Sequence, residues 1–307
     1  MKTQLVQDPV TLLWKVISGT PLEQAVIAFI HTSWGTRDYF PGPQPISIER
    51  SHFPLLKKNK YVVCEKSDGV RHLLVSFMFG DKKICVLVNR MFTITLVPLN
   101  LPKIAYQGTI LDGELVDTTF LIYDAVVVSG TNVKDFNLIE RLQSAEKILM
   151  GVMRVKTDPV SLKMKTFCSL KEYDYNTVVS GTDGLIFTPV HESIKTGTHE
   201  TMFKWKPRDK NTIDFQFKRW DPQNKWGMYV LEKGRLVFES ELLYIKSPDW
   251  ITDEDCIVEC QYMCDEEPRW WKPICIRNDK THPNNRRTFY RTLFNIRENI
   301  QIKEFCK

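Results

Sequence analysis

The sequence lacks the features that would place it at once in several classes of protein. No run of about 18 apolar residues occurs, so no transmembrane helix is expected. The N-terminal residues MKTQLVQDPV have no basic start followed by an apolar core, so they do not resemble a secretory signal. Internal repeats and low-complexity tracts are also missing. The 307 residues are therefore expected to form a globular chain with room for two domains.

A large charge excess and a P-loop are absent as well. The 42 basic and 37 acidic side chains leave a net charge of +5, which permits an anionic partner but does not require one. The pattern G-x-x-x-x-G-K followed by Ser or Thr does not occur, which excludes phosphate binding by a P-loop. The six histidines show no metal-ligand spacing, and His72 is interpreted as a packed residue within a strand.

The eight cysteines are scattered along the chain, which favours free thiols in a reducing compartment. Cys256, Cys260 and Cys264 repeat every four residues, a spacing that would align three thiolates on a helix. The segment CIVECQYM around them is rich in β-forming residues. We therefore interpret it as a strand that carries the thiols on one face as small hydrophobic groups, and not as a metal site.

Hydrophobic periodicity predicts helices at residues 22–32 and 137–153, where apolar positions recur at helical spacing. Residues 39–45, YFPGPQP, form a proline-rich connector that cannot continue a helix. Residues 61–124 are a succession of apolar strands that are separated by turn signals. The first two thirds of the chain are thus predicted to form a mixed domain.

The last third has a different pattern. From residue 212 onward, five short strands in fewer than a hundred residues suggest a small barrel, and residues 286–300 carry one apolar face of a terminal helix. We predict an α+β fold with a domain at 1–210, a β-barrel domain at 211–290 and a C-terminal helix at 291–307.

Polar clusters interrupt or end several of the apolar strands. They are the segments EKSDGVR, VNR, LDGELV, TDGLIF, FKWKPRDKNTIDF and IRNDKTHPNN. One such cluster is usually a structural ion pair, because a buried charge is costly unless it is paired. Six clusters with a balance of cations and carboxylates indicate a shared site. Its cations would hold a polyphosphate, and its carboxylates would hold Mg²⁺ and sugar hydroxyls.

The lysine at the end of the first apolar strand, Lys66, has chemistry of its own. An amine that is desolvated and crowded by other cations can lose its proton near neutral pH and become a nucleophile. A phosphorus centre with a pyrophosphate leaving group on Mg²⁺ is a natural target for such an amine.

The order of these clusters resembles that of the covalent nucleotidyltransferases, which comprise ATP-dependent DNA ligases, RNA ligases and mRNA capping guanylyltransferases. EKSDGVR resembles their motif I, LDGELV their motif III, FLIYDAV their motif IIIa, TDGLIF their motif IV and FKWKP their motif V. NTIDF after motif V, and RNDKTHPN as motif VI, are similar to the capping enzymes in particular. The resemblance covers about residues 46–290 and leaves the first 45 residues without a counterpart.

The resemblance implies a two-domain nucleotidyltransferase fold of antiparallel sheets and helices with a C-terminal OB-fold lid. It also implies GTP as the substrate and Mg²⁺ (or Mn²⁺) as the cofactor. Lys66 would attack the α-phosphate of GTP and form a lysyl–GMP intermediate, and Asp183 would bind the metal. Arg71 would contact the ribose or the phosphates of the acceptor. Lys204 and Lys206 would contact the α-phosphate while pyrophosphate leaves.

Further residues are implied to bind the nucleotide. Arg90 and Glu114 would hold the ribose hydroxyls, and Tyr123 and Ile186 would cover the two faces of guanine. Lys165, or its neighbour Lys163, would read the guanine O6 atom. The remaining nucleotide-binding residues that the resemblance implies are Asp214 in NTIDF and Arg277, Asp279 and Lys280 in the lid, where the last three would reach the β- and γ-phosphates.

The leading hypothesis is therefore an mRNA guanylyltransferase that transfers GMP to the 5′-diphosphate end of RNA. One alternative is an ATP-dependent polynucleotide ligase, against which NTIDF and RNDKTHPN count. Another is a catalytically silent module that binds RNA ends or a polymerase, against which the intact lysines count. The chain is expected to be either a stand-alone guanylyltransferase or one domain of a larger protein.

The same resemblance implies partners and a compartment. A cellular enzyme would work in the nucleus with an RNA triphosphatase and the phosphorylated tail of RNA polymerase II, whereas a viral one would act in the host cytoplasm or the virion. No membrane partner is expected. Trp270 and Trp271 could stack on RNA bases, although barrel core is the favoured interpretation. The basic stretch NNRRTFYR could contact RNA phosphates or simply begin a solvated helix.

Overall fold

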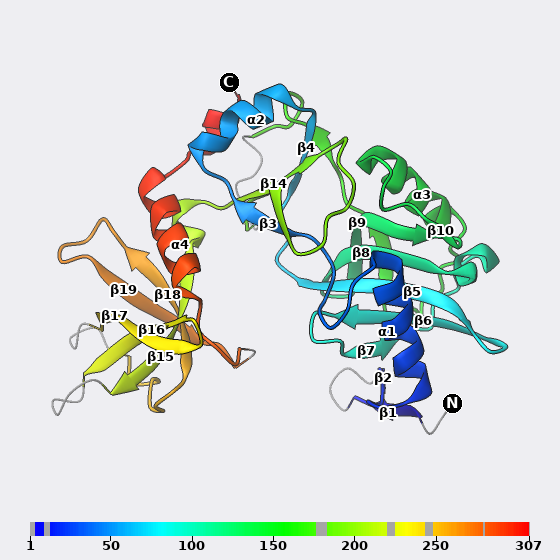
Figure 1. Cartoon of the computed structure of the whole chain (residues 1–307), viewed down its shortest axis with the longest axis horizontal. Coiled ribbons are helices and arrows are strands. Elements are labelled where there is room, and N and C mark those ends of the chain that lie inside the picture. Colours follow the sequence, from blue (N-terminus) through cyan, green and yellow to red (C-terminus); the bar gives the residue numbers. More distant parts are fainter. Residues whose placement is uncertain are drawn as a thin grey trace. The chain divides into compact units, whose positions relative to one another are not determined.

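The computed structural model describes residues 4–8, 13–175, 183–219, 225–242, 248–278 and 280–306 (Figure 1). The chain divides into two compact units. Unit 1 comprises Met1–Ile46 and Leu55–Lys204, and unit 2 comprises Ser47–Pro54 and Trp205–Lys307. Residues 47–54 thus belong to unit 2, although the segments on both sides of them in the sequence belong to unit 1.

A nine-stranded sheet forms the body of unit 1. Its order is β1-β2-β7-β6-β5-β8-β9-β10, with β11 beside β9. The strands are β1 Leu5–Gln7, β2 Trp14–Val16, β5 Val70–Phe79, β6 Lys82–Asn89, β7 Ile94–Leu96, β8 Thr109–Val116, β9 Thr119–Val128, β10 Thr131–Asn132 and β11 Ser161–Met164. All of these pairs are antiparallel except β11 with β9.

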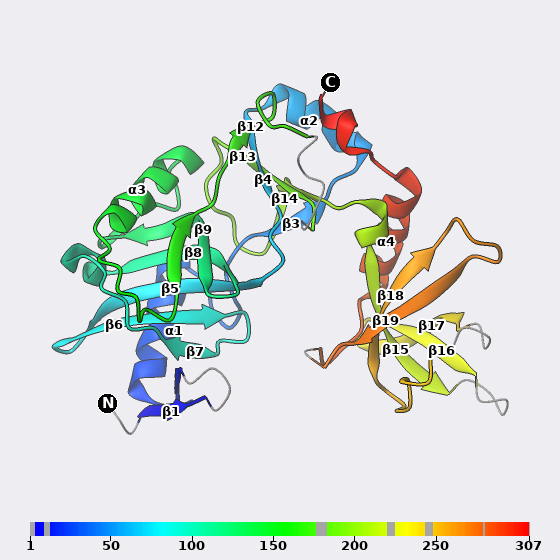
Figure 2. The ribbon, with the colours of Figure 1, turned by 180° about the vertical axis from the view of Figure 1, so that it is seen from behind.

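Two helices pack on opposite faces of this sheet (Figure 2). Helix α1 (Pro21–Trp34) shares a core with Leu73 and Val75 of β5, whereas α3 (Leu138–Met150) shares a core with Leu74, which points to the other face. The predicted succession of strands and the two predicted helices are confirmed, whereas the order of the strands and the faces that the helices cover come from the structure.

The ends of both helices follow from local sequence. Thr20 accepts a hydrogen bond from the backbone N–H of Glu23 at the start of α1, and the helix ends at Gly35, which has φ 71°. Asn137 and Glu140 form a capping box at the start of α3. Helix α3 ends at Met150, three residues before the predicted end, because the chain turns at Gly151 against Pro102.

A second, five-stranded sheet in the order β12-β4-β13-β14-β3 carries the segment that leads to Lys66. Its strands are β12 Cys168–Ser169, β4 Tyr61–Glu65, β13 Leu185–Pro189, β14 Thr198–Trp205 and β3 Gln44–Ser47. Strand β4 is buried along four of its five residues and pairs with β12 and β13 in antiparallel register. The described residues also form the short helices η2 Arg50–His52, α2 Phe53–Lys58, η3 Lys103–Gln107, η4 Arg208–Lys210 and η6 Ile302–Cys306.

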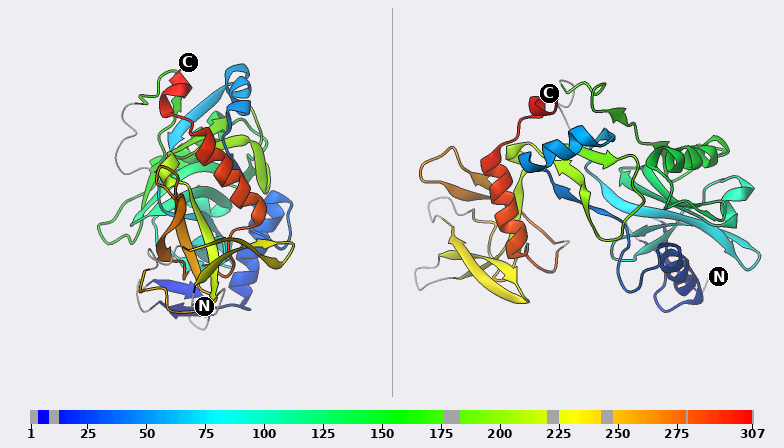
Figure 3. Two further views of the ribbon diagram at one scale, coloured as in Figure 1. Left: turned by 90° about the vertical axis from the view of Figure 1, so that its left-hand side faces the viewer. Right: turned by 45° about the horizontal axis from the view of Figure 1, so that its top comes forward.

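Unit 2 contains an antiparallel five-stranded sheet in the order β17-β16-β15-β18-β19, together with helix α4 (Arg286–Glu298) (Figure 3). The strands are β15 Thr212–Arg219, β16 Trp226–Glu232, β17 Arg235–Glu241, β18 Ile257–Met263 and β19 Trp270–Ile276. The five predicted strands and the terminal helix are present, and the mixed α+β class with antiparallel sheets is confirmed.

Three ambiguous sequence features of unit 2 have structural roles. Trp271 is buried in the core, and the indole N–H of Trp270 donates to Glu266. Arg286 at the start of α4 pairs with Glu232 and Glu239 of the sheet. The predicted strand is present as β18, with Cys260 buried inside it, whereas the half-buried Cys256 and Cys264 lie just beyond its two ends. In the described ranges, no helix has the length and apolar character needed to cross a membrane.

Buried His199 is expected to make the stability of unit 1 depend on pH. Its side chain is 2% exposed and lies 3.2 Å from the Thr201 hydroxyl, which donates to Glu192. The pKa of His199 is lowered from 6.5, first by burial and then by the charge of Lys195, although Glu192 opposes the shift. The folded state therefore takes up its proton at lower pH than the unfolded state does.

We expect the free energy of unfolding to fall as the pH drops below about 6.5. The contribution of His199 to this fall should level off once the pH is below the pKa of His199 in the folded protein. Urea unfolding at several pH values measures this effect. Replacing His199 with Gln should make the free energy of unfolding depend less on pH between pH 7.5 and pH 5.5. Replacing the exposed His191 with Gln should leave this pH dependence unchanged. An equal pH slope in wild type and His199→Gln would contradict the assignment.

Candidate active site

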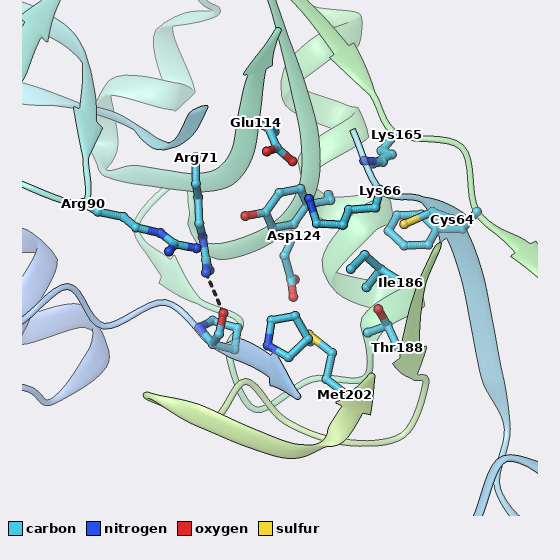
Figure 4. A pocket seen from close by; sticks show the side chains of 14 residues that line it. Cys64, Lys66, Arg71, Arg90, Glu114, Asp124, Lys165, Ile186, Thr188 and Met202 are labelled. Atoms are coloured by element: carbon cyan, nitrogen blue, oxygen red, sulfur yellow. Dashed lines mark hydrogen bonds between the residues drawn. The ribbon is translucent and has the colours of Figure 1, made fainter. Parts of the chain in front are cut away.

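A pocket in unit 1 collects side chains from both sheets (Figure 4). It is lined by Pro43, Pro45, Cys64, Lys66, Arg71, Arg90, Glu114, Tyr123, Asp124, Lys165, Phe167, Ile186, Thr188 and Met202. The predicted residues that the structure brings together here are Lys66, Arg71, Arg90, Glu114, Tyr123, Lys165 and Ile186. They lie in six separate segments of the chain. Four of the six polar clusters, EKSDGVR, VNR, LDGELV and TDGLIF, thus contribute to one pocket, whereas FKWKPRDKNTIDF and IRNDKTHPNN contribute no residue to its described lining.

Lys66 follows β4 directly, and Asp183 lies two residues before β13, so that the two side chains face each other. The backbone N–H of Lys66 donates to the Gly184 carbonyl at 2.8 Å, and the Asp183 N–H donates to the Lys66 carbonyl at 3.1 Å. These bonds align the two side chains, and the Lys66 Nζ atom lies 2.6 Å from Asp183 Oδ2. The strand pairing thus places the proposed nucleophile beside the proposed metal ligand.

The turn between Lys66 and Arg71 depends on Gly69. A Cβ atom at this position would lie 2.5 Å from the Leu115 carbonyl oxygen and 2.8 Å from the Val116 side chain. Only glycine lets the chain pass this close to β8 before β5 begins. The turn sends Lys66 and Arg71 into the same pocket from two different sheets.

Arg71 is only 9% exposed and is held on several sides. Its guanidinium donates to both carboxylate oxygens of Asp112, at 2.9 and 2.5 Å, and to the Pro43 carbonyl at 2.5 Å. Burial by itself lowers the pKa of Arg71, but Asp112, Tyr123 and Asp124 together outweigh this effect, so the pKa is raised and the cation is retained. Tyr123 also donates to Asp112, at 2.9 Å. The Tyr123 pKa is well above 10.0, mainly because of burial.

Arg90 and Glu114 add charge to the wall that Arg71 occupies. The pKa of Arg90 is lowered, first by partial burial and then by the neighbouring positive charge of Arg71. Figure 4 shows the two arginines extending toward the same side of the pocket. Glu114 lies opposite Arg71 in the β5–β8 pairing. This wall can offer donors and an acceptor to hydroxyl and phosphate groups.

An apolar wall faces these charges. Ile186 of β13 pairs with Cys64 of β4, and both side chains line the pocket. Cys64 is 3% exposed, and burial raises the pKa of its thiol to about 12, so it is an inert part of the wall. Tyr123 adds an aromatic ring to the lining of the pocket. The apolar wall suits the flat face of a nucleobase.

The two lysine candidates for guanine recognition differ in position. Lys165 lines the pocket and its Nζ atom donates to the Ser67 hydroxyl at 2.8 Å, one residue from Lys66. Lys163 is exposed on β11 and is not among the described residues that line the pocket. The geometry therefore favours Lys165 for contact with a bound base.

Asp124 is a pocket residue that the sequence did not single out. Its carboxylate is 4% exposed and accepts two hydrogen bonds from Arg141 of α3, at 2.6 and 3.0 Å. Arg141 also donates to the Phe136 and Glu192 carbonyls. The pair joins the pocket wall to α3. The sequence could have indicated this position, because Asp124 is a carboxylate within an otherwise mostly apolar strand.

The other predicted residues lie apart from the lining of this pocket. Lys204 is half-buried near the end of β14, and Lys206 follows the strand; neither belongs to the described lining. Unit 2 brings Arg277 within 3.1 Å of Asp214, and Lys280 within 3.8 Å of the same carboxylate. Asp279 lies outside the described residues.

Glu259 belongs to the same group of charges as Asp214, Arg277 and Lys280 in unit 2. The sequence did not predict Glu259 as part of this group. Its carboxylate lies 3.3 Å from the Arg277 guanidinium and accepts a hydrogen bond from Thr212 at 2.6 Å. It sits on β18 opposite Asp214 of β15. The position could have been found only from the register of these two strands.

Asp183 could hold a divalent cation at this site together with the phosphates of a substrate. Mg²⁺ is often bound by one or two carboxylates together with substrate phosphates and water. A larger carboxylate cluster is therefore not required, and the described residues contain none of three or more potential ligands. Asp183 beside Lys66 is the carboxylate whose position suits this type of coordination.

This pocket has the charges and the apolar wall that a nucleotidyltransferase of the covalent class requires. The comparisons with known proteins identify the family within that class. The model of "mRNA capping enzyme, catalytic domain" matches residues 17–208, and that of "mRNA capping enzyme, C-terminal domain" matches residues 210–306. The chain belongs to the mRNA capping enzyme family.

Curated relatives carry the same description. The mRNA-capping enzyme subunit alpha of Schizosaccharomyces pombe is 27% identical over 327 residues, which cover 88% of this chain and 80% of that protein. The Neurospora crassa subunit alpha is 26% identical, with 86% and 83% covered. The mRNA-capping enzyme of Mus musculus is 27% identical, with 80% of this chain but only 45% of that longer protein covered.

Solved structures that are similar to this chain include ligases. A mycobacterial DNA ligase D complexed with ATP and MES has a TM-score of 0.43 and 14% identity, and covers 72% of this chain and 90% of that one. The ATP-dependent DNA ligase of bacteriophage T7 in complex with ATP has a TM-score of 0.39 and 14% identity, with 77% and 98% covered.

Family membership confirms the predicted activity. The chain is a GTP–RNA guanylyltransferase, with GTP as one substrate and RNA as the other. The family match favours this activity over the alternative of an ATP-dependent polynucleotide ligase.

Proposed function

We propose that the chain transfers GMP from GTP to the 5′-diphosphate end of RNA through a covalent intermediate on Lys66. The observation that carries this proposal is the position of the Lys66 amine, 2.6 Å from Asp183 within a pocket that also contains Arg71 and Arg90. A nucleophile, a carboxylate and cations in one pocket suit attack on a phosphate whose leaving group is anionic.

The first step forms one bond and breaks one. The unprotonated Lys66 amine attacks the α-phosphorus of GTP, a P–N bond forms, and the bond from that phosphorus to the bridging oxygen of pyrophosphate breaks. The amine proton passes to solvent, and pyrophosphate leaves. In the second step, a β-phosphate oxygen of the RNA end attacks the same phosphorus, the P–N bond breaks, and Lys66 takes up a proton as the GpppN cap is released.

The pocket residues would bind GTP before this chemistry. Tyr123 and Ile186 would cover the guanine faces, and Lys165 would donate to the O6 atom. Arg90 and Glu114 would bind the ribose hydroxyls. These assignments rest on the lining of the pocket and on the resemblance to the family.

The phosphates would meet a second set of residues. Arg71 would use N–H groups that are left over from Asp112 and Pro43, and Lys204 and Lys206 would contact the α-phosphate. Arg277, Asp279 and Lys280 of unit 2 would act on the β- and γ-phosphates, and Asp214, which pairs with Arg277 and Lys280, would also take part in nucleotide binding. Asp183 would hold Mg²⁺ (or Mn²⁺) together with phosphate oxygens, and the ion would neutralise charge on the leaving pyrophosphate.

The remaining proposals concern partners and place. The RNA must arrive with a 5′-diphosphate, so a triphosphatase that removes the γ-phosphate must act before this enzyme. If the protein is cellular, we propose the nucleus as its compartment and the phosphorylated tail of RNA polymerase II as a partner. If it is viral, we propose the host cytoplasm or the virion.

Nucleotide-specific labelling tests the proposed function. Incubation with α-labelled GTP and Mg²⁺ should label the chain covalently, and α-labelled ATP at the same concentration should not. The phosphoramidate bond should release label in acid and retain it in alkali. Equal labelling from both nucleotides, or label from ATP alone, would favour the ligase alternative, and no label from either would support a silent module.

Lys165 allows a sharper form of this experiment. Replacing Lys165 with Met should lower labelling from GTP by about tenfold, because one hydrogen bond from a charged donor to the base is lost. The exposed neighbour Lys163 is the matched control, and its replacement by Met should change labelling by less than about twofold. Equal losses in the two variants would contradict the assignment of Lys165.

A further inference from the structure

The connector at residues 39–45, YFPGPQP, carries none of the short motifs of the family, although the catalytic-domain model at residues 17–208 includes it, and the structure places it against the pocket. Pro43 and Pro45 line the pocket directly. The Pro43 carbonyl accepts a hydrogen bond from Arg71 Nη1 at 2.5 Å, marked by the dashed line in Figure 4. The Gln44 N–H donates to the Gly197 carbonyl at 2.7 Å, which anchors the connector at the start of β3.

The connector also packs against the Arg71 guanidinium through the ring of Phe40. The Cζ atom of Arg71 lies 5.4 Å from the centre of the Phe40 ring and 5.7 Å from the centre of the Tyr123 ring. Both distances are within the range of cation–π attraction. Asp112 holds the edge of the same guanidinium through two hydrogen bonds. Within the described residues, these contacts use three of the five N–H groups of an arginine.

Gly42 shows how closely the connector approaches Arg71. A Cβ atom at this position would clash with Arg71 Nη2. It would also lie 2.7 Å from Arg71 Cζ and 3.0 Å from the Phe40 ring. The backbone of Gly42 is not in the positive-φ region, so alanine would be acceptable for the backbone itself. The obstacle is the guanidinium, which cannot move aside without breaking its bonds to Asp112 and Pro43.

We propose that the connector positions Arg71, and with it the Asp112–Tyr123 wall, for nucleotide binding. Phe40, Gly42 and Pro43 are the positioning residues. They act through Arg71, because Gly42 leaves room for the guanidinium, Phe40 packs against it and the Pro43 carbonyl orients one of its donors. The inference rests on the proposed function, since it assumes that this pocket is where GTP forms the lysyl adduct.

A double-mutant cycle on Gly42 and Arg71 tests this inference. Gly42→Ala in the otherwise native chain should reduce kcat/KM for covalent labelling by GTP about 10- to 100-fold, as expected when a binding group is displaced by about 1 Å. Much of the loss should be a higher GTP concentration for half-maximal labelling, because the guanidinium and the Tyr123 ring act before chemistry. In an Arg71→Lys background, Gly42→Ala should change kcat/KM by less than about threefold, since the smaller head group leaves space for the methyl.

Control variants separate positioning from loss of fold. Gln44→Ala alters an exposed side chain of the same connector and should label like wild type. Thermal unfolding of each variant shows whether it folds, and if Gly42→Ala does not, Phe40→Leu replaces it in the same cycle. An equal loss in both Arg71 backgrounds, or no loss in either, would overturn the inference while wild-type labelling leaves the proposed function intact. A wild-type chain that forms no lysyl–GMP would overturn both.

Discussion

Lys66→Ala should abolish covalent labelling by GTP. The amine is the atom that bonds to phosphorus in the proposed mechanism, and removal of a covalent nucleophile costs at least about a thousandfold in rate. Lys66→Arg should fail as well. Its guanidinium can still pair with Asp183, but it keeps its proton at neutral pH and is not a nucleophile. Labelling with α-labelled GTP, followed by denaturing electrophoresis, measures the effect directly.

The matched control is Lys60→Ala. Lys60 is an exposed lysine just before β4, so its removal changes the net charge by the same amount at the other end of the same strand. It should label within about twofold of wild type. If Lys66→Ala retained label, and peptide mapping placed GMP on another residue, the assignment of the nucleophile would be wrong.

Arg141→Met should destabilise unit 1 by about 3–5 kcal/mol, because Asp124 would then be a buried carboxylate without its cationic partner. Both side chains of the pair are almost fully buried, so solvent cannot replace the missing partner. For a unit of this size, the change corresponds to a fall of the thermal midpoint on the order of 10 °C. Thermal unfolding followed by circular dichroism measures it.

The pH dependence of this loss provides a second readout. Burial raises the pKa of Asp124 above 3.8, and Arg141 opposes that shift, so removal of Arg141 should raise the pKa further. A carboxyl group with a raised folded pKa contributes stability at low pH that is lost as the pH rises through that pKa. The difference between Arg141→Met and wild type should therefore be largest at neutral pH and shrink on acidification.

Two further variants complete the test of this ion pair. Lys147→Met removes an exposed cation from the same helix and should change stability by less than about 0.5 kcal/mol. Adding Asp124→Ala to Arg141→Met should recover part of the loss, because no buried charge remains. Recovery should be incomplete, since the Phe136 and Glu192 carbonyls still lack the Arg141 donor. A double variant that is less stable than Arg141→Met would contradict the explanation.

Much of the candidate site could be predicted from local sequence. Lys66 and Glu114 lie in or beside short apolar strands, and a charge in such a strand is visible without coordinates. Ile186 follows in the apolar strand directly after the Asp-Gly pair of TDGLIF. The resemblance to the family then assigned a chemical role to each. Family membership confirms the activity, while the individual roles await the experiments above.

The connector and the carboxylates that hold the arginines could not be assigned in this way. Arg71 lies opposite Glu114 in the β5–β8 pairing, yet its guanidinium bonds to Asp112, which lies two residues away on β8. Glu259 meets Arg277 only because β15 and β18 pair in one particular register. Strand pairing and side-chain reach decide such contacts, and neither is encoded within a short motif.

The sequence by itself determined the strand and helix pattern, the ordered motifs and the family, because each depends on residues that are close together along the chain. Tertiary structure alone decided which carboxylate holds Arg71, that Asp124 needs Arg141, and that a proline-rich connector forms a wall of the pocket. The physical reason is the cost of burying charge. Each buried guanidinium or carboxylate must find a partner, and the fold brings that partner from a distant part of the chain.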